Sequence, residues 1–118
     1  MLDRLPELKT LFAHGGGYAC WAGPRFDHGY KVRREAQGGT EAFPSEYLSR
    51  MWYDSLVHGY VNLRHLVDVV GIGQVVLGTD FPADMGQPDP VIWLAGSDLT
   101  RDEQTAVLGG NAAALLGI

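Results

Sequence analysis

Three short apolar runs predict β-strands at residues 8–13, 51–54 and 74–77. The first and third runs are almost continuously apolar, which is typical of strands that are covered on both faces. Glycine or a polar residue follows each run, so each predicted strand ends abruptly.

Helical patterns cover the segments 18–34, 44–50, 61–70, 100–108 and 111–116. The 61–70 segment carries leucine and valine at three- and four-residue spacing, which predicts an apolar stripe. Pro24 is expected to bend or restart the first helix, because proline removes a backbone hydrogen bond. Pro44 stands at a favoured first helical position, and Thr100 with Glu103 forms a capping-box pattern.

Strands and helices alternate, which predicts right-handed βαβ units with a parallel sheet in one α/β domain spanning residues 1–118. A closed barrel needs about eight strands, so three strands would form only part of one. Residues 1–5 read as the last turn of a helix, so the domain begins in the middle of a pattern and we expect a part of it to be missing upstream; the alternative is an ordinary frayed terminus. Residues 36–43 predict a loop at the rim.

Composition narrows the class of protein. The 118 residues are 46% hydrophobic and 19% charged, as in globular proteins. A net charge of −5 without a basic stripe predicts no nucleic-acid partner. No apolar run approaches the roughly 18 residues that span a membrane, and the N-terminus does not resemble a leader. The single cysteine, Cys20, agrees with a reducing compartment. We predict a cytoplasmic protein without a membrane partner.

Two polar side chains stand at the ends of predicted strands, where parallel α/β proteins carry functional groups. His14 ends the first run and precedes three glycines, and Asp80 follows the third run after Gly78 and Thr79. The small neighbours would let a ligand approach the backbone. Each residue also has an ordinary structural interpretation: a histidine satisfied by hydrogen bonds, and an aspartate that accepts backbone N–H groups in a turn.

Five blocks occur in order along the chain: LFAHGGG at 11–17, Arg25 with HGY at 28–30, YD at 53–54 with VH at 57–58, VLGTDFP at 76–82 and GNA at 110–112. Together they resemble the amidohydrolase superfamily, and most closely its aminocarboxymuconate-semialdehyde decarboxylase-like branch. HGGG alone also recurs in unrelated lipases. Five collinear blocks that cover essentially the whole chain are far more specific.

The resemblance implies a fold and a set of roles. Members form a metal-dependent hydrolase-type (β/α)8 TIM barrel with one divalent metal, usually zinc, and the chain would be its C-terminal portion, about strands six to eight. Asp80 matches the metal ligand after the eighth strand. His14 matches the histidine after the sixth, an acid/base group beside the metal-bound water. This chemistry is coherent, because an imidazole can accept and donate a proton near neutral pH.

Two arginines carry further implications of the resemblance. Arg25 matches an arginine that, in decarboxylase members, reaches across a dimer interface to the substrate carboxylate, and Arg33 matches a second arginine of that region. The guanidinium group suits this task, since its planar fork binds a carboxylate through two hydrogen bonds. A homodimer and a small carboxylate substrate are therefore expected. The alternative for both arginines is a solvated helix face.

Five other residues receive no functional role. Trp21 is expected to pack between helix and barrel rather than line a pocket, and His65 is expected at the surface. Asp54 is expected to anchor a loop near the rim, and His58 to be structural. Cys20 is expected to be an inert small residue, since nothing electropositive stands near it in the sequence.

Two departures from the family pattern limit the functional inference. No His-x-His motif occurs, whereas the family places two metal ligands in that motif and a third on another histidine. A zinc site needs at least three protein ligands, so we expect the 118-residue chain alone to bind no catalytic metal and to have no activity. Ala83 stands where many decarboxylases of the family have a substrate-contacting aromatic residue, so the pocket is wider or built for a different acid and the substrate stays open. Decarboxylation and hydrolysis both stay open, because both use the same metal-water site.

Three hypotheses follow from the sequence. The chain is the C-terminal part of a metal-dependent decarboxylase or hydrolase, or a catalytically inactive truncated barrel that serves as a remnant or as a docking or oligomerisation module. The third is a complete small α/β domain that binds a ligand through His14 and the glycines. A three-stranded parallel sheet has open edges and uncovered apolar faces, which disfavours the third hypothesis and predicts aggregation or oligomerisation in isolation.

Overall fold

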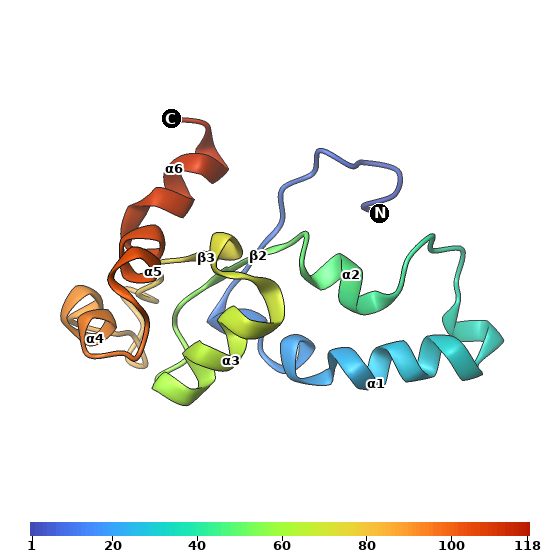
Figure 1. Ribbon diagram of the computed structural model, residues 1–118, viewed down its shortest axis with the longest axis horizontal. Helices are drawn as coiled ribbons and strands as arrows, with labels where there is room; N and C mark the ends of the chain where they lie inside the picture. The colour runs from blue at the N-terminus through green and yellow to red at the C-terminus, as the bar shows by residue number, and fades with distance from the viewer.

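The computed structural model describes all 118 residues and shows one small parallel sheet with helices around it (Figure 1). The strands are β1 (Leu11–Phe12), β2 (Trp52–Asp54) and β3 (Val75–Val76), in the order β1-β2-β3. Tyr53, in the middle strand, lies opposite Phe12 on one side and Val75 on the other. The alternation of elements and the parallel sheet agree with the prediction.

The first strand differs from its prediction. It spans two residues instead of six and is not covered, since Leu11 is 53% exposed and Phe12 38% exposed. In β3, by contrast, Val75 and Val76 are both buried, as predicted. The difference arises because β3 packs against the C-terminal helical segments, whereas β1 makes extensive contacts with β2 and with no helix.

Helix α1 (Tyr18–Val32) is one uninterrupted helix, so of the two outcomes predicted at Pro24, a bend or a restart, the restart does not occur. Helix α2 (Pro44–Leu48) packs along it, and the two extend away from the sheet (Figure 1). Asp27 accepts hydrogen bonds from the backbone N–H and the hydroxyl of Ser45, at 2.9 and 2.6 Å. Packing against α2 offsets the single backbone hydrogen bond that Pro24 removes.

Helix α3 (Tyr60–Val70) has the predicted apolar stripe, with Leu63, Leu66, Val67 and Val70 buried. This stripe and Tyr53 of β2 belong to one hydrophobic core. A short 3₁₀ turn, η3 (Ile72–Gln74), connects α3 to β3.

The C-terminal region contains one helix that the sequence did not predict, α4 (Pro90–Ala95), whose Leu94 is fully buried. Six residues are too few to establish a helical period. Helix α5 (Arg101–Thr105) begins with the predicted capping box: Thr100 and Glu103 exchange side-chain to backbone hydrogen bonds.

The side-chain amide of Asn111 connects the C-terminal helices to the sheet by hydrogen bonds. A π-helical turn, η4 (Ala106–Gly110), joins α5 to α6 (Asn111–Leu116). The side-chain nitrogen of Asn111 donates to the carbonyl oxygens of Ile72 and Val75, both at 2.7 Å. The start of α6 is thereby fixed to β3.

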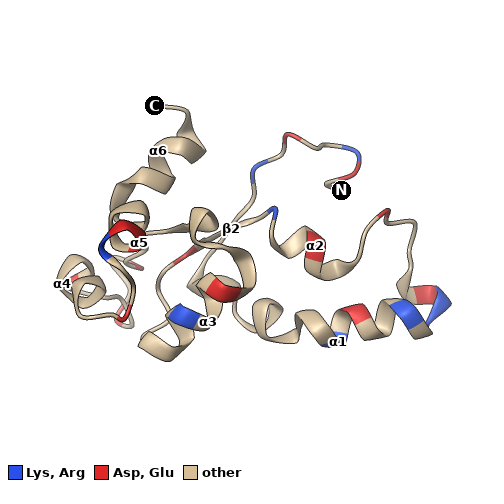
Figure 2. Ribbon diagram, viewed as in Figure 1, with Lys and Arg blue, Asp and Glu red and all other residues tan.

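Charged side chains gather at the end of α1 that is remote from the strands (Figure 2), where Lys31, Arg33, Arg34 and Glu35 follow one another closely. No helix is both long enough and apolar enough to cross a membrane. A cytoplasmic location stays a prediction.

Candidate active site

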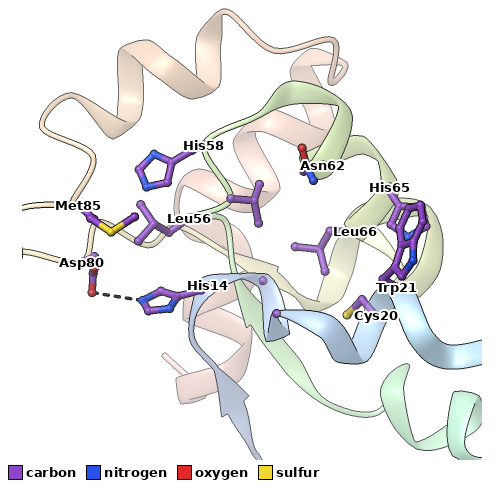
Figure 3. Close-up of a pocket in the computed structure, with 13 residues that line it drawn as sticks. His14, Cys20, Trp21, Leu56, His58, Asn62, His65, Leu66, Asp80 and Met85 are labelled. Carbon is purple, nitrogen blue, oxygen red and sulfur yellow. Dashed lines mark ion pairs between the residues drawn. The ribbon is translucent and has the colours of Figure 1, made fainter. Parts of the chain in front are cut away.

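A cavity of about 410 Å³ lies beside the C-terminal ends of the three strands (Figure 3). We call it the strand-end cavity. His14 follows β1, His58 follows β2 and Asp80 follows β3, and all three residues line it. The topology therefore gathers at one edge of the sheet residues that are far apart in the sequence, as parallel α/β folds generally do.

His14 and Asp80 are in contact. The Nε2 atom of His14 lies 3.4 Å from Oδ1 of Asp80, and the two side chains are 60% and 31% exposed (Figure 3). No backbone N–H group donates to the Asp80 carboxylate, so a turn-capping role has no support. Its other oxygen, Oδ2, has no hydrogen-bond or ion-pair partner within the chain, and a carboxylate oxygen is a donor that suits a divalent metal.

The end of β2 braces the segments that follow β1 and β3. Oδ1 of Asp54 accepts hydrogen bonds from the backbone N–H groups of Gly15 and Leu56, at 2.9 and 3.1 Å. The hydroxyl of Ser55 accepts one from the N–H of Gly78 at 3.3 Å. A Cβ atom on Gly78 would lie 2.6 Å from that of Asp54, so this position requires glycine. Asp54 thus anchors the rim of the cavity, as predicted.

The backbone of the cavity is unusual at three points. His14, His58 and Asp80 are the only non-glycine residues of the chain with positive φ, at 55°, 55° and 56°. Residues with side chains rarely adopt this conformation, and such residues cluster at functional sites. Gly15 continues the same turn, and a Cβ there would lie 2.5 Å from the Val57 side chain.

Arg25 and Arg33 lie elsewhere. Both line a depression of about 590 Å³ on α1 and the segment after it, together with Tyr30 and Pro44. We call this the arginine depression. The structure thus brings His14 into contact with Asp80 and places Arg25 and Arg33 in one other depression, so the two pairs lie in different hollows. No lysine or arginine lines the strand-end cavity.

The prediction for Trp21 is wrong, and His65, expected at the surface, is partly buried. Trp21 is 70% exposed and lines the strand-end cavity, with its ring centroid 5.3 Å from that of His65. Nε2 of His65 is buried and has no hydrogen-bond partner. Because α1 and α3 pack together, side chains from both helices meet at the edge of the cavity. The sequence carries no signal of that meeting.

Cys20 also lines this cavity, with 4% of its surface exposed. Burial raises the pKa of its thiol, and a hydrogen bond with Tyr53 opposes this only in part. A thiol with a raised pKa is a poor nucleophile at neutral pH. This agrees with the prediction that Cys20 is inert.

Metal-binding side chains do not form a complete site within the chain. Nowhere among the 118 residues do three or more histidine, cysteine, aspartate or glutamate side chains converge on one point. A catalytic zinc site uses three protein ligands. Asp80 therefore fits one ligand position of such a site and not the whole site.

Comparison with known proteins gives consistent matches. The amidohydrolase family profile matches residues 1–118. The 2-amino-3-carboxymuconate-6-semialdehyde decarboxylase of Dictyostelium discoideum is 36% identical over 120 residues, covering 100% of this chain and 33% of that protein.

Two solved structures have the same fold over almost the whole chain. One is 5-carboxyvanillate decarboxylase from Sphingomonas paucimobilis, with TM-score 0.86 and 28% identity over 99% of this chain and 36% of that one. The other is a dihydroxybenzoic acid decarboxylase from a Polaromonas species with bound manganese, with TM-score 0.84 and 17% identity over 98% and 36%. The chain spans about a third of the length of each relative.

Proposed function

The chain belongs to the amidohydrolase family, and on that basis we propose that it supplies the C-terminal share of the active site of a metal-dependent carboxy-lyase acting on a small carboxylic acid. The predicted fold class, a portion of a TIM barrel, is confirmed by the structures that it matches. The observation that carries the proposal is the 3.4 Å contact between His14 and Asp80 over the strand-end cavity. Relatives named as decarboxylases favour decarboxylation over hydrolysis.

Asp80 is the residue that would hold the metal, with the other ligands coming from the remainder of a barrel. Asp80 lines the cavity, and its carboxylate accepts no backbone hydrogen bond. A bound divalent metal supplies Lewis-acid chemistry, polarising an oxygen of the substrate or of a water molecule. Zinc is the metal that the family resemblance favours, and manganese is bound in the Polaromonas structure.

His14 is the proposed acid/base group. Decarboxylation breaks a C–C bond and leaves an electron pair on carbon, which must take up a proton. The His14 imidazole, 3.4 Å from Asp80 at the edge of the cavity, can hold and deliver that proton, because imidazole is a general acid and base suited to neutral pH.

Arg25 and Arg33 are the proposed binding groups for the substrate carboxylate. The strand-end cavity has no lysine or arginine of its own, whereas carboxylate recognition favours a guanidinium group. The arginine depression is a separate hollow, so its side chains would serve the strand-end cavity of a second copy. A homodimer follows from this proposal.

A hybrid barrel tests the proposed function. The 118-residue chain is co-expressed with the part of the Dictyostelium relative that it does not match, and the purified assembly is loaded with zinc or manganese. We expect conversion of 2-amino-3-carboxymuconate 6-semialdehyde with release of CO₂, and none from either part alone. If the two parts assemble and bind metal but remain inactive while the intact relative is active, the chain is a docking module and the proposal is wrong.

A further inference from the structure

One residue of the strand-end cavity has the same setting as His14 and Asp80 but no role so far. Each of the three strands is followed by one non-glycine residue with positive φ, and the residue after β2 is His58. Such a conformation is unfavourable for a residue with a side chain and persists where the surrounding structure imposes it. His14 and Asp80, at two of these three positions, have the proposed acid/base and metal-binding roles, so a functional role is expected at His58 as well.

A structural role for His58 has little support. Its imidazole makes no hydrogen bond and no ion pair within the chain, and the residue is exposed. Gly15 and Leu56 are held by Asp54, so the cavity rim does not need the His58 ring. Glycine would satisfy the backbone at lower cost.

The polarity of the cavity suggests what the ring could bind. Asp80 is its acidic residue, and no lysine or arginine lines it. Figure 3 shows the ring of His58 on the other side of Leu56 and Met85 from the His14–Asp80 pair. A carboxylic acid lying between them would meet apolar side chains along its length and an unpartnered imidazole N–H at one end.

We propose that His58 is a substrate-binding residue that donates a hydrogen bond to an anionic oxygen of the carboxylic acid, on the side of the strand-end cavity away from Asp80. This inference rests on the proposed function and adds a group that orients the substrate from this chain itself. The ring binds but transfers no proton, so it acts on affinity more than on the chemical step.

Two substitutions separate the ring from the backbone conformation. His58→Gly removes the ring and suits a φ of 55°, and His58→Asn retains a donor on a residue that also tolerates this conformation. Val61→Ala is the control, because Val61 is 83% exposed, lies in the same segment and does not line the cavity. All are assayed in the hybrid barrel beside Asp80→Asn.

We expect His58→Gly to raise KM roughly ten- to hundredfold with kcat changed much less, the loss typical of a hydrogen bond to a charged group. Added imidazole should lower that KM again, His58→Asn should be intermediate, and the thermal midpoint should not fall. An unchanged KM in His58→Gly, in a hybrid that Asp80→Asn inactivates, overturns the inference alone. A hybrid inactive with His58 intact overturns the proposed function and this inference with it.

Discussion

The strand-end cavity and the arginine depression are built in different ways. In the cavity, His14 and Asp80 project from the ends of parallel strands, and hydrogen bonds to Asp54 fix the backbone beside His14. Arg25 lies in helix α1, which extends away from the sheet and packs against α2, and Arg33 directly follows the last residue of that helix. The comparison teaches that the sheet fixes the proposed groups for chemistry, whereas the proposed groups for substrate recognition lie on and after a helix that extends away from it.

The largest expected effect is at Asp80. Asp80→Asn in the hybrid barrel should remove metal and activity together, with a loss beyond the roughly hundredfold that follows when a supporting hydrogen bond to a ligand is lost. Metal content by elemental analysis and CO₂ release are the measurements. If Asp80→Asn keeps both its metal and its activity, the strand-end cavity is not the site of the reaction.

The arginine depression should respond differently. Arg25→Ala should raise KM by roughly ten- to hundredfold through the lost charged hydrogen bonds to the substrate carboxylate, while metal content is unchanged. Arg34→Ala is the matched control, since Arg34 is exposed and lies outside the depression. Mixing Arg25→Ala subunits with Asp80→Asn subunits should restore part of the activity if the arginine acts on a second copy. If Arg25→Ala and the unchanged protein have equal kcat and KM, Arg25 does not bind the substrate.

A third prediction concerns the brace of the cavity. Asp54→Ala leaves the N–H groups of Gly15 and Leu56 without their acceptor, so the free energy of unfolding should fall by about 1–3 kcal/mol. Urea unfolding of the hybrid, followed by tryptophan fluorescence, measures the loss. The matched substitution near the other hollow, Asp27→Ala, removes two hydrogen bonds to Ser45 and should affect KM more than metal binding. If Asp54→Ala and Asp27→Ala change the metal content equally, the strand-end cavity and the arginine depression do not have the separate roles proposed for them.

The smallest effect is expected at Glu103, which lies in neither hollow. The backbone N–H of Thr100 is the main cause that lowers the pKa of Glu103 below its ordinary 4.5, and Arg64 adds to it. Because the folded pKa is depressed, the stabilisation is present above pH 4.5 and is lost as the pH falls through the folded value. The difference in urea midpoint between Glu103→Gln and the unchanged protein should therefore shrink in acid. A difference that stays constant with pH contradicts this explanation.

Local patterns predicted much of the fold. The stripe of α3 and the capping box at Thr100 are properties of neighbouring residues, and both occur as expected. The strand-end rule alone placed His14 and Asp80 at one edge of the sheet. The sequence could not predict that β1 is exposed, because an apolar run has the same pattern whether or not a helix packs against it.

What the sequence missed depends on contacts between distant segments. Trp21 meets His65 only because α1 and α3 pack together, and Pro24 is tolerated because α2 lies along α1. The positive φ of His58 has no sequence signal beyond its place after a strand. The roles of His14, Asp80, Arg25 and Arg33 stay predictions, because geometry shows where they lie and not what they bind.

The carboxylate of Asp54 has a consequence for how this sequence can change. It holds the N–H of Gly15 after β1 and fills the space where a side chain on Gly78, after β3, would lie. The three loops around the pocket consequently cannot diverge one at a time. Selection for a new substrate, in nature or in a library, would have to keep Asp54 and its two glycines as a unit and vary the walls at Leu56 and Met85 instead.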